Sequence, residues 1–214
     1  MVQSQRKEVN SFIESFENIK DRTIVIVDYG NVEKWKNSLK WKVDIKNLAQ
    51  LVRKFSDGSV ELRRFYYRED FEPKESTKDV IDWSRSILER AKMNRFYLIK
   101  KRVKYIREAN NKTGYEKKCD MDVEMTVDLI RLKDKYDNIV IFSGDGDLMY
   151  AVRYITENFN KRCYVFGVRD HIGREVIDAL NDGVIEKILY GEDFEYRLNR
   201  NRFYKNFSFG RKKF

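Results

Sequence analysis

Five aspartates stand at three widely separated places in the chain, each beside an expected strand end or helix start: Asp28, Asp120, Asp122, Asp145 and Asp147. Two carboxylates held about 4 Å apart repel each other by roughly 4 kcal/mol at an effective dielectric of about 20. A hard divalent cation removes this cost, and oxygen ligands of this kind suit Mg²⁺ or Mn²⁺. If the fold brings these side chains together, the pattern predicts a metal-dependent enzyme.

The elements around these aspartates place them at one edge of an α/β fold. Asp28 ends the apolar run of residues 23–27, and Asp145 follows the apolar run that begins at Ile139. Neither run shows polar alternation, which is typical of strands buried on both faces. Asp122 stands near the start of a helical pattern. In doubly wound sheets ligands bind beyond the carboxyl ends of the strands, so we expect the three acids to reach one ion.

Helical and strand patterns alternate along the chain. Helices are expected over residues 5–20, 44–55, 78–93, 120–135, 147–158 and 172–179, and strands over residues 23–28, 60–67, 95–107, 138–143, 162–168 and 184–189. This alternation predicts an α/β three-layer sandwich around a mostly parallel central sheet. In the helix over 120–135 we expect Val123, Val127 and Ile130 to face the core.

Residues 29–42 are expected to form a loop after the first strand. The three tryptophans, Trp35, Trp41 and Trp83, are interpreted mainly as packing residues. Trp35 follows Asn31 so closely in sequence that it could line a substrate groove.

The composition is that of a folded globular protein. The chain has 214 residues, 42% of them hydrophobic, and a single proline, so we expect one domain with short appendages rather than two domains and a linker. No apolar stretch approaches the roughly 20 residues of a membrane span, and residues 1–20 lack the apolar centre of a secretory signal. Two cysteines and one histidine argue against a disulfide framework, a structural zinc site and most histidine-based triads. We therefore expect a cytoplasmic protein that uses carboxylate chemistry.

The net charge of +9 is unevenly distributed. Basic residues far outnumber acidic ones in residues 85–118 and again in residues 197–214, so the rest of the chain is acidic overall. A basic surface beside an acidic pocket suits an enzyme that cuts a polyanion. In the first basic segment the candidate nucleic-acid contacts are Lys101, Arg102, Lys104 and Arg107, although a solvated edge strand would carry the same residues.

Three sequence blocks, residues 26–31, 118–128 and 143–148, resemble the NYN-domain ribonucleases, a branch of the PIN-like nuclease superfamily. The resemblance covers most of the chain between residues 23 and 190. It implies a PIN-like, Rossmann-like fold with helices on both faces of a parallel sheet. It also implies a metal site formed by Asp28, Asp122, Asp145 and Asp147, with Asn31 orienting a ligand or a water beside Asp28.

Two more aspartates of the second block are less clearly ligands. The family usually has a small or apolar residue at the position of Asp120, so the choice between Asp120 and Asp122 stays open, and Asp120 also suits the N-cap of its helix. Asp128 matches a recurrent acid of the family. It follows Asp122 by about 240° around a helix, so we expect Asp128 to form a salt bridge rather than to ligate the ion.

The mechanism that the resemblance implies is metal-assisted hydrolysis of RNA phosphodiester bonds by an endonuclease. A divalent ion, Mg²⁺ or Mn²⁺, would polarise a phosphate oxygen and lower the pKa of a bound water. Asp28 and Asp145 are the expected direct ligands, whereas Asp122 and Asp147 would bind directly or through water. The number of ions stays open.

Further contacts are expected around this centre. Lys118 would meet a phosphate, and Ser143 would hold a substrate oxygen or a metal-bound water. The expected organisation is a helical extension over residues 1–22, a nuclease domain over residues 23–191 and a basic aromatic tail over residues 192–214. Such a tail suits single-stranded nucleic acid, although a disordered segment or an oligomer contact would carry the same residues. The expected partner is RNA, single-stranded or structured, and a homodimer is left open.

Two rival functions remain at this stage. The first is a catalytically inactive RNA-binding module with the same fold, against which the retained acids argue. The second is a Toprim-like or nucleotidyl-transfer domain that uses the pair Asp145 and Asp147. The first strand lacks the glutamate that a Toprim site needs.

Overall fold

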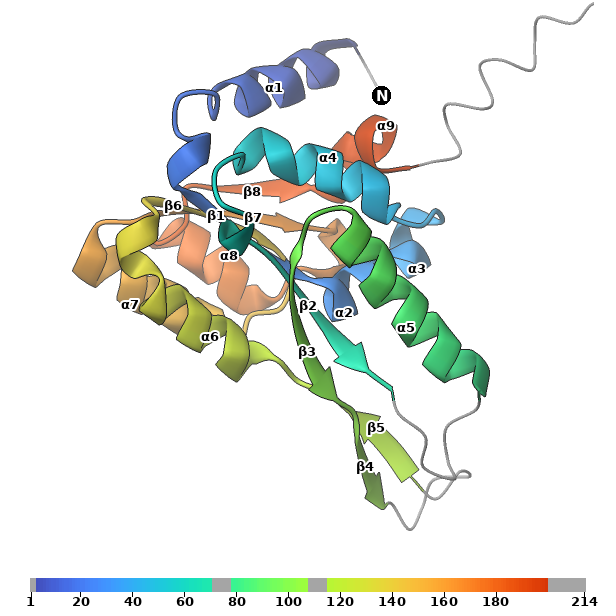
Figure 1. Ribbon diagram of the computed structural model, residues 1–214. Helices are drawn as coiled ribbons and strands as arrows, with labels where there is room; N and C mark the ends of the chain where they lie inside the picture. The colour runs from blue at the N-terminus through green and yellow to red at the C-terminus, as the bar shows by residue number, and fades with distance from the viewer. Residues whose placement is uncertain (1–2, 71–77, 108–114, 200–214) are drawn as a thin grey trace, which may run out of the picture.

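The computed structural model describes residues 3–70, 78–107 and 115–199. Within these ranges a six-stranded sheet with all neighbouring strands parallel forms the centre of the molecule (Figure 1). The strands, in their spatial order, are β3 (Tyr97–Arg102), β2 (Arg63–Glu69), β1 (Thr23–Asp28), β6 (Asn138–Phe142), β7 (Arg162–Gly167) and β8 (Lys187–Tyr190). The predicted α/β class with a mostly parallel sheet is confirmed.

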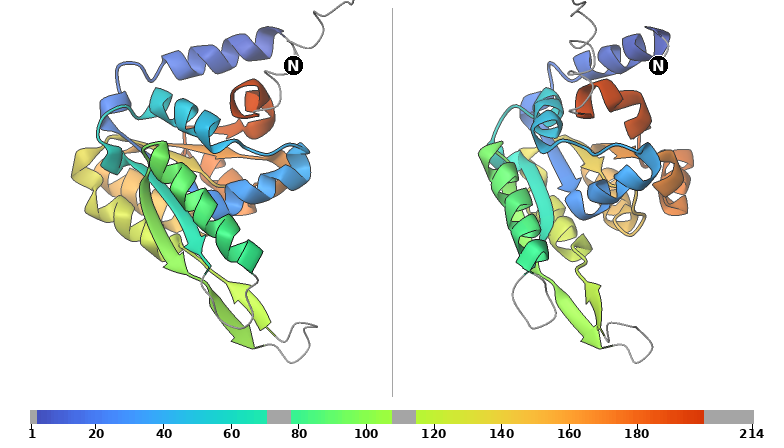
Figure 2. Two further views of the ribbon diagram at one scale, coloured as in Figure 1. Left: turned by 45° about the vertical axis from the view of Figure 1, so that its right-hand side comes forward. Right: turned by 90° about the vertical axis from the view of Figure 1, so that its right-hand side faces the viewer.

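Helices cover both faces of the sheet and make the fold a three-layer sandwich (Figure 2). On one face lie α1 (Gln3–Glu14), α4 (Ile45–Phe55), α5 (Lys78–Met93) and α9 (Glu195–Leu198). On the other face lie α6 (Asp122–Arg131), α7 (Met149–Phe159) and α8 (Arg174–Asn181).

Strand β1 shows why its sequence lacks polar alternation. Val25 and Val27 join the core beneath α4 and α5, whereas Ile24 and Ile26 join the core beneath α6 and α7. All four side chains are fully buried. Complete burial of such a side chain stabilises the fold by about 1.5–3 kcal/mol, so an apolar residue is favoured at every position of this central strand.

The strand order reverses between β1 and β6, because the chain first builds outward to β3 and then returns to the other side of β1. Ligand sites of doubly wound sheets lie at such a reversal, beyond the carboxyl ends of the strands. The segment after β1 was expected to be a loop but is mostly helical, with α2 (Tyr29–Val32), a 3-10 turn (Glu33–Trp35) and α3 (Lys36–Leu39). The Asp28 side chain caps α2 and so starts this helical segment at the edge of the sheet.

The long strand expected over residues 95–107 is divided in two. β3 ends at Arg102, and β4 (Lys104–Arg107) pairs instead with β5 (Tyr115–Lys118) in an antiparallel hairpin that extends away from the sheet (Figure 2). The neighbouring strand β2 ends at Glu69, so residues beyond Val103 have no partner in the sheet. The expected loop over residues 110–114 lies outside the described residues.

Helix α6 is rotated relative to the sequence-based expectation. Val123, Val127 and Ile130 are 69%, 51% and 39% exposed, so the expectation that they face the core is wrong. Met125 and Leu129 occupy the core instead. The two stripes differ by about 200° around the helix and have the same spacing, so periodicity does not choose between them.

Several element ends differ from the expected ones. A 3-10 turn (Val60–Leu62) replaces the start of the expected second strand because the Ser59 hydroxyl accepts a hydrogen bond from the Glu61 backbone N–H and forms its cap. The first helix ends at Glu14 rather than near residue 20. Helix α6 ends at Arg131, and a 3-10 turn (Lys133–Lys135) follows it.

The two ends of the described chain pack against each other. The Asn10 side chain accepts hydrogen bonds from Tyr196 at 2.9 Å and from Arg197 at 2.8 Å, which joins α1 to α9. The Phe16 ring then packs edge-to-face on Phe55 and Tyr164. Residues 200–214 of the predicted tail lie outside the described residues. None of the helices in the described ranges has the length and apolar character that crossing a bilayer requires.

Candidate active site

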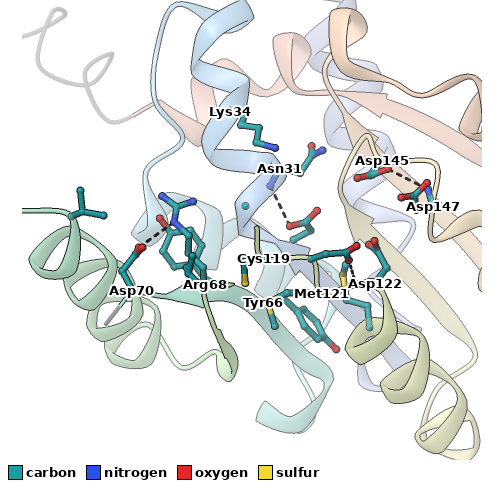
Figure 3. A pocket seen from close by; sticks show the side chains of 17 residues that line it. Asn31, Lys34, Tyr66, Arg68, Asp70, Cys119, Met121, Asp122, Asp145 and Asp147 are labelled. Carbon is teal, nitrogen blue, oxygen red and sulfur yellow. Dashed lines mark hydrogen bonds and ion pairs between the residues drawn. The ribbon is translucent and has the colours of Figure 1, made fainter. Parts of the chain in front are cut away.

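A pocket of about 390 Å³ opens at the carboxyl end of the sheet, beside β1, β2 and β6 (Figure 3). All the aspartates that the sequence singled out for metal chemistry line it: Asp28, Asp120, Asp122, Asp145 and Asp147. They come from three distant segments, which the parallel sheet brings to one edge. We call this space the acid pocket.

Asp28 is fixed by two hydrogen bonds. Its Oδ1 accepts one from the Asn31 backbone N–H at 3.2 Å, and its Oδ2 accepts one from the Ser143 hydroxyl at 3.0 Å. Burial raises the pKa of Asp28 above its ordinary value, and the nearby charge of Asp145 acts in the same direction. The two hydrogen bonds and the charge of Lys34 oppose this shift without cancelling it. The carboxylate therefore has a rigid position but incomplete charge compensation.

Asn31 ties the two loops of the acid pocket together. Its Oδ1 accepts hydrogen bonds from the Trp35 indole N–H at 2.8 Å and from the Gly144 backbone N–H at 3.1 Å. Trp35 is fully buried, which agrees with its interpretation as a packing residue and rules out the alternative that it lines a substrate groove; its indole N–H supports Asn31. Because the carbonyl oxygen is used in this way, a ligand beside Asp28 would meet the amide N–H groups of Asn31.

The loop after β6 presents Asp145 and Asp147 to solvent at the rim of the acid pocket. The Ser143 hydroxyl accepts a hydrogen bond from the Asp145 backbone N–H, and Asp145 Oδ1 accepts one from the Asp147 backbone N–H, both at 3.2 Å. A Cβ atom at Gly144 would lie 2.1 Å from the His171 carbonyl oxygen, so only glycine fits there. The loop after β6 therefore packs closely against the backbone at His171, which explains the glycine between Ser143 and Asp145.

Asp120 and Asp122 form a carboxylate pair at the start of α6. Asp120 Oδ1 accepts a hydrogen bond from the Asp122 backbone N–H at 3.0 Å, although the N-cap position belongs to Met121. Burial raises the pKa of Asp122 to about 8, and the charges of Asp120, Asp145 and Asp28 add to this effect. The hydrogen bond from the Asp122 side chain lowers the pKa of Asp120. The two carboxylates therefore titrate together rather than independently.

Two cations that the sequence analysis missed line the acid pocket, namely Lys34 and Arg68. Arg68 follows the end of the buried part of β2 and forms ion pairs with Glu33 and Asp70, both at 3.3 Å. The rule that found Asp28 and Asp145, a polar residue at the carboxyl end of a buried strand, also applies to Arg68. Lys34 lies one helical turn after Asn31, and its charge lowers the pKa of Asp28. Neither cation neutralises the acid cluster as a whole.

Asp128 lies away from the acid pocket, as expected from the helical geometry. Its carboxylate accepts hydrogen bonds from the Arg64 guanidinium at 2.7 Å, from the Tyr66 hydroxyl at 2.7 Å and from Arg131 at 2.5 Å. The Arg64 side chain is 1% exposed. This buried ion pair fixes α6 against β2 and thereby sets the position of Asp122 at the helix start.

The predicted phosphate contacts lie around the hairpin and β3. Lys118 and Lys104 are exposed and face each other across the hairpin register, and the charge of Lys118 acts on Asp120. The Lys101 ammonium group is committed to Glu124 at 2.9 Å and to the Asp120 carbonyl at 2.7 Å, so it holds the start of α6 against β3. Arg102 is exposed at the end of β3. The side chain of Arg107 lies outside the described part of the structure.

The carboxylate oxygens of the acid pocket suit a hard cation, whereas the Ser143 hydroxyl and the Asn31 carbonyl oxygen are already used in hydrogen bonds within the protein. In the described residues, however, no three acidic, histidine or cysteine side chains stand close enough to form a ready-made metal centre. The carboxylates share one pocket and repel one another at longer range. Ion binding at this site therefore requires side-chain rotation toward a common point.

Comparisons with known proteins bear on the fold and the family of the chain. A stretch of 55 residues is 33% identical to the low amplitude and bright protein LabA of Synechococcus elongatus, and the match covers 26% of this chain and 30% of that relative. A crystal structure of a protein of unknown function from Vibrio parahaemolyticus superposes with a TM-score of 0.55 at 19% identity, over 80% of this chain and 93% of that one, and so shares the fold. The NYN domain family, whose PIN-like fold is of the nuclease type, matches residues 22–187. The chain belongs to the NYN domain family.

Proposed function

We propose that the protein is a metal-dependent ribonuclease that hydrolyses RNA phosphodiester bonds in the acid pocket. The observation that carries this proposal is the gathering of Asp28, Asp122 and Asp145 from three distant segments into one pocket with incomplete charge compensation. Carboxylates that destabilise one another in this way are suited to a ligand of opposite charge. Membership in a family with a nuclease-type fold supports the same reading.

The acids would hold Mg²⁺ or Mn²⁺, with Asp28 and Asp145 as direct ligands and Asp122 and Asp147 bound directly or through water. When bound, the ion would supply Lewis-acid activation of water and stabilise charge on the phosphate. Asp28 is the best oriented of the four, because two hydrogen bonds hold its carboxylate in place. Asp122 reaches the site from the first turn of α6.

The cations of the acid pocket would position the substrate. Lys34 lines the pocket without an ion pair in the described residues, so its ammonium group is free to meet a phosphate oxygen. Arg68 is held by Glu33 and Asp70 and would contribute a fixed positive charge. Contacts of this kind orient a polynucleotide without reading its bases, which suits an endonuclease with relaxed sequence preference.

The test is cleavage of a labelled RNA by the purified protein with Mn²⁺, with Mg²⁺ and with EDTA. We expect the ions to stimulate cleavage and the Asp28→Asn variant to lose at least about 99% of the rate. Asp134→Asn is the matched control, because that side chain is 85% exposed and lies outside the acid pocket. Equal cleavage by the Asp28→Asn variant and the wild type would contradict the assignment.

A second candidate is an RNA-binding module that does not cleave. The observation that favours it is that no three acids of the described residues stand close enough to hold an ion without rotating. The two functions separate in one pair of measurements, metal-induced change in melting temperature and RNA turnover. An ion that binds only the folded state raises the melting temperature. If the protein binds RNA but shows neither a metal-induced rise in melting temperature nor RNA turnover, it is a binding module rather than a nuclease.

A further inference from the structure

A second depression, of about 490 Å³, lies between α5 and the helical segment after β1. Its lining includes Glu33, Lys36, Lys40, Trp41, Lys42 and Trp83. We call it the Trp83 groove. Figure 1 shows α5 beside the short helices α2 and α3, and the hydrogen bond between Trp83 and Glu33 joins the two elements.

Three lysines give the Trp83 groove a positive charge. Lys36, Lys40 and Lys42 form no ion pair within the described residues. The acids of the groove are already used, since Asp44 pairs with Arg90 at 3.0 Å and Glu33 pairs with Arg68 at 3.3 Å. The groove therefore offers three uncompensated cations to an anionic ligand.

Trp83 places an aromatic surface among these lysines. It is 43% exposed, which is unusual for a residue whose only role is packing. Its indole N–H donates a hydrogen bond to Glu33 Oε1 at 2.7 Å, so the ring has a fixed orientation on α5. The Lys42 ammonium lies 5.4 Å from the ring centroid. An ordered aromatic ring beside a cation is the arrangement by which proteins stack a base and neutralise its phosphate.

Glu33 lies between the Trp83 groove and the acid pocket. Its Oε2 accepts a hydrogen bond from the Tyr67 hydroxyl at 2.8 Å and pairs with Arg68, and both of these partners line the acid pocket. Glu33 is 14% exposed and is neutralised by Arg68, so it presents little negative charge to a ligand that crosses it. The next residue, Lys34, lines the acid pocket itself. Glu33, its partner Arg68 and the adjacent Lys34 thus connect the two depressions.

We propose that the Trp83 groove binds the single-stranded part of a polynucleotide that flanks the phosphate held in the acid pocket. A base would stack on Trp83, and Lys36, Lys40 and Lys42 would contact the adjoining phosphates. This inference rests on the proposed nuclease function for the role of the acid pocket. An acidic peptide would use the lysines equally well but would have no planar group for the ring, so the aromatic surface favours a nucleic acid.

The test measures binding without cleavage. A fluorescent oligouridylate of about ten nucleotides, within the site sizes of single-strand binders, is titrated into the full chain carrying Asp28→Asn in EDTA, with anisotropy as readout. Trp83→Ala is expected to weaken binding about tenfold, whereas Trp83→Phe retains most of the affinity because a ring remains. Replacing the three lysines by glutamine is expected to reduce the slope of log affinity against log salt by roughly 0.7 per lysine.

Two controls match these variants on surfaces away from the groove. Tyr154→Ala removes an aromatic ring of similar exposure, 46%, from α7 on the opposite face of the sheet. Lys187→Gln removes an exposed cation from the first position of β8, at the other edge of the sheet. Both are expected to bind the oligouridylate as the Asp28→Asn parent does.

The outcomes separate this inference from the proposed function. If the Trp83→Ala variant, with folding verified by circular dichroism, binds the oligouridylate as tightly as its Asp28→Asn parent, the proposal that the groove binds RNA is overturned, even if the wild type cleaves RNA. Lost binding in that variant together with no metal-stimulated cleavage by the wild type would support the groove and reject the nuclease. Poly-glutamate that binds with the same dependence on Trp83 would overturn the assignment to a nucleic acid.

Discussion

Helix α6 carries two aspartates whose electrostatic surroundings are opposite. Asp122, in the first turn, faces the charges of Asp28, Asp120 and Asp145. Asp128, further along the same helix, accepts hydrogen bonds from two arginines and a tyrosine. Both are aspartates in one short helix, so local propensity does not separate them. The partners that the fold supplies make the difference.

This difference distinguishes a structural carboxylate from a functional one. The charge of Asp128 is compensated within the protein, and the buried pair it forms holds α6 on the sheet. The charge of Asp122 is opposed by other acids, so the isolated protein gains nothing from it. Sites that violate local consistency in this way are commonly functional, and the predictions that follow test whether the contrast holds.

The largest expected effect is on catalysis at the Asp122 end. Asp122→Asn keeps the shape of the side chain but removes its charge, so we expect the metal-stimulated rate of RNA cleavage to fall about 1,000-fold, or roughly 4 kcal/mol in activation free energy. Initial rates at saturating Mn²⁺ measure this. The same substitution at Asp128 tests the contrast, because a similar loss there with no loss of stability would remove the distinction between the two aspartates.

The next effect is on stability at the Asp128 end. Asp128→Asn leaves the buried Arg64 guanidinium without its counter-charge, and breaking such a pair costs about 3 kcal/mol. Urea unfolding followed by circular dichroism gives the change in the free energy of unfolding. Arg131→Gln is the milder companion, since that partner is 48% exposed. An unchanged urea midpoint in the Asp128→Asn variant would show that the pair does not hold α6.

The third effect is a pH dependence of stability at Asp122. The pKa of Asp122 is raised to about 8 in the folded protein and is about 3.9 in the unfolded chain. Between these values the folded state binds more protons, so the free energy of unfolding decreases as the pH rises. Asp122→Asn should therefore gain stability relative to the wild type between about pH 5 and pH 8, by ~1 kcal/mol after allowance for solvent screening. Urea midpoints in EDTA measure this, and a difference that does not vary with pH contradicts it.

Much of the contrast was accessible from the sequence. The apolar run before Asp28 and the run before Asp145 each predict a buried strand, and parallel strands bring their carboxyl ends to one edge. Helical geometry alone separates Asp128 from Asp122 by about 240°. These inferences depend only on local patterns and on the rules of parallel sheets, and the described structure places the aspartates accordingly.

What the sequence could not supply were choices between equivalent local patterns. Trp83 and Trp35 are the same residue type in helical segments, yet Trp83 is 43% exposed and Trp35 is fully buried, because only tertiary packing decides between them. The division of β3 from β4 depends on where the neighbouring strand β2 ends. Lys101 was grouped with the phosphate contacts, but its partner Glu124 comes from a separate element.

The smallest expected effect concerns the face of α6 that the periodicity placed in the core. Val127 is 51% exposed, so Val127→Thr should change the free energy of unfolding by less than about 0.5 kcal/mol. Met125, on the opposite stripe, is 2% exposed, and Met125→Ala should cost about 2 kcal/mol or more through the cavity it leaves. Urea unfolding of both variants measures the rotation of the helix directly. A large loss for Val127→Thr with none for Met125→Ala would mean that the Val127 stripe faces the core. In that orientation Asp122 would point away from Asp28 and Asp145.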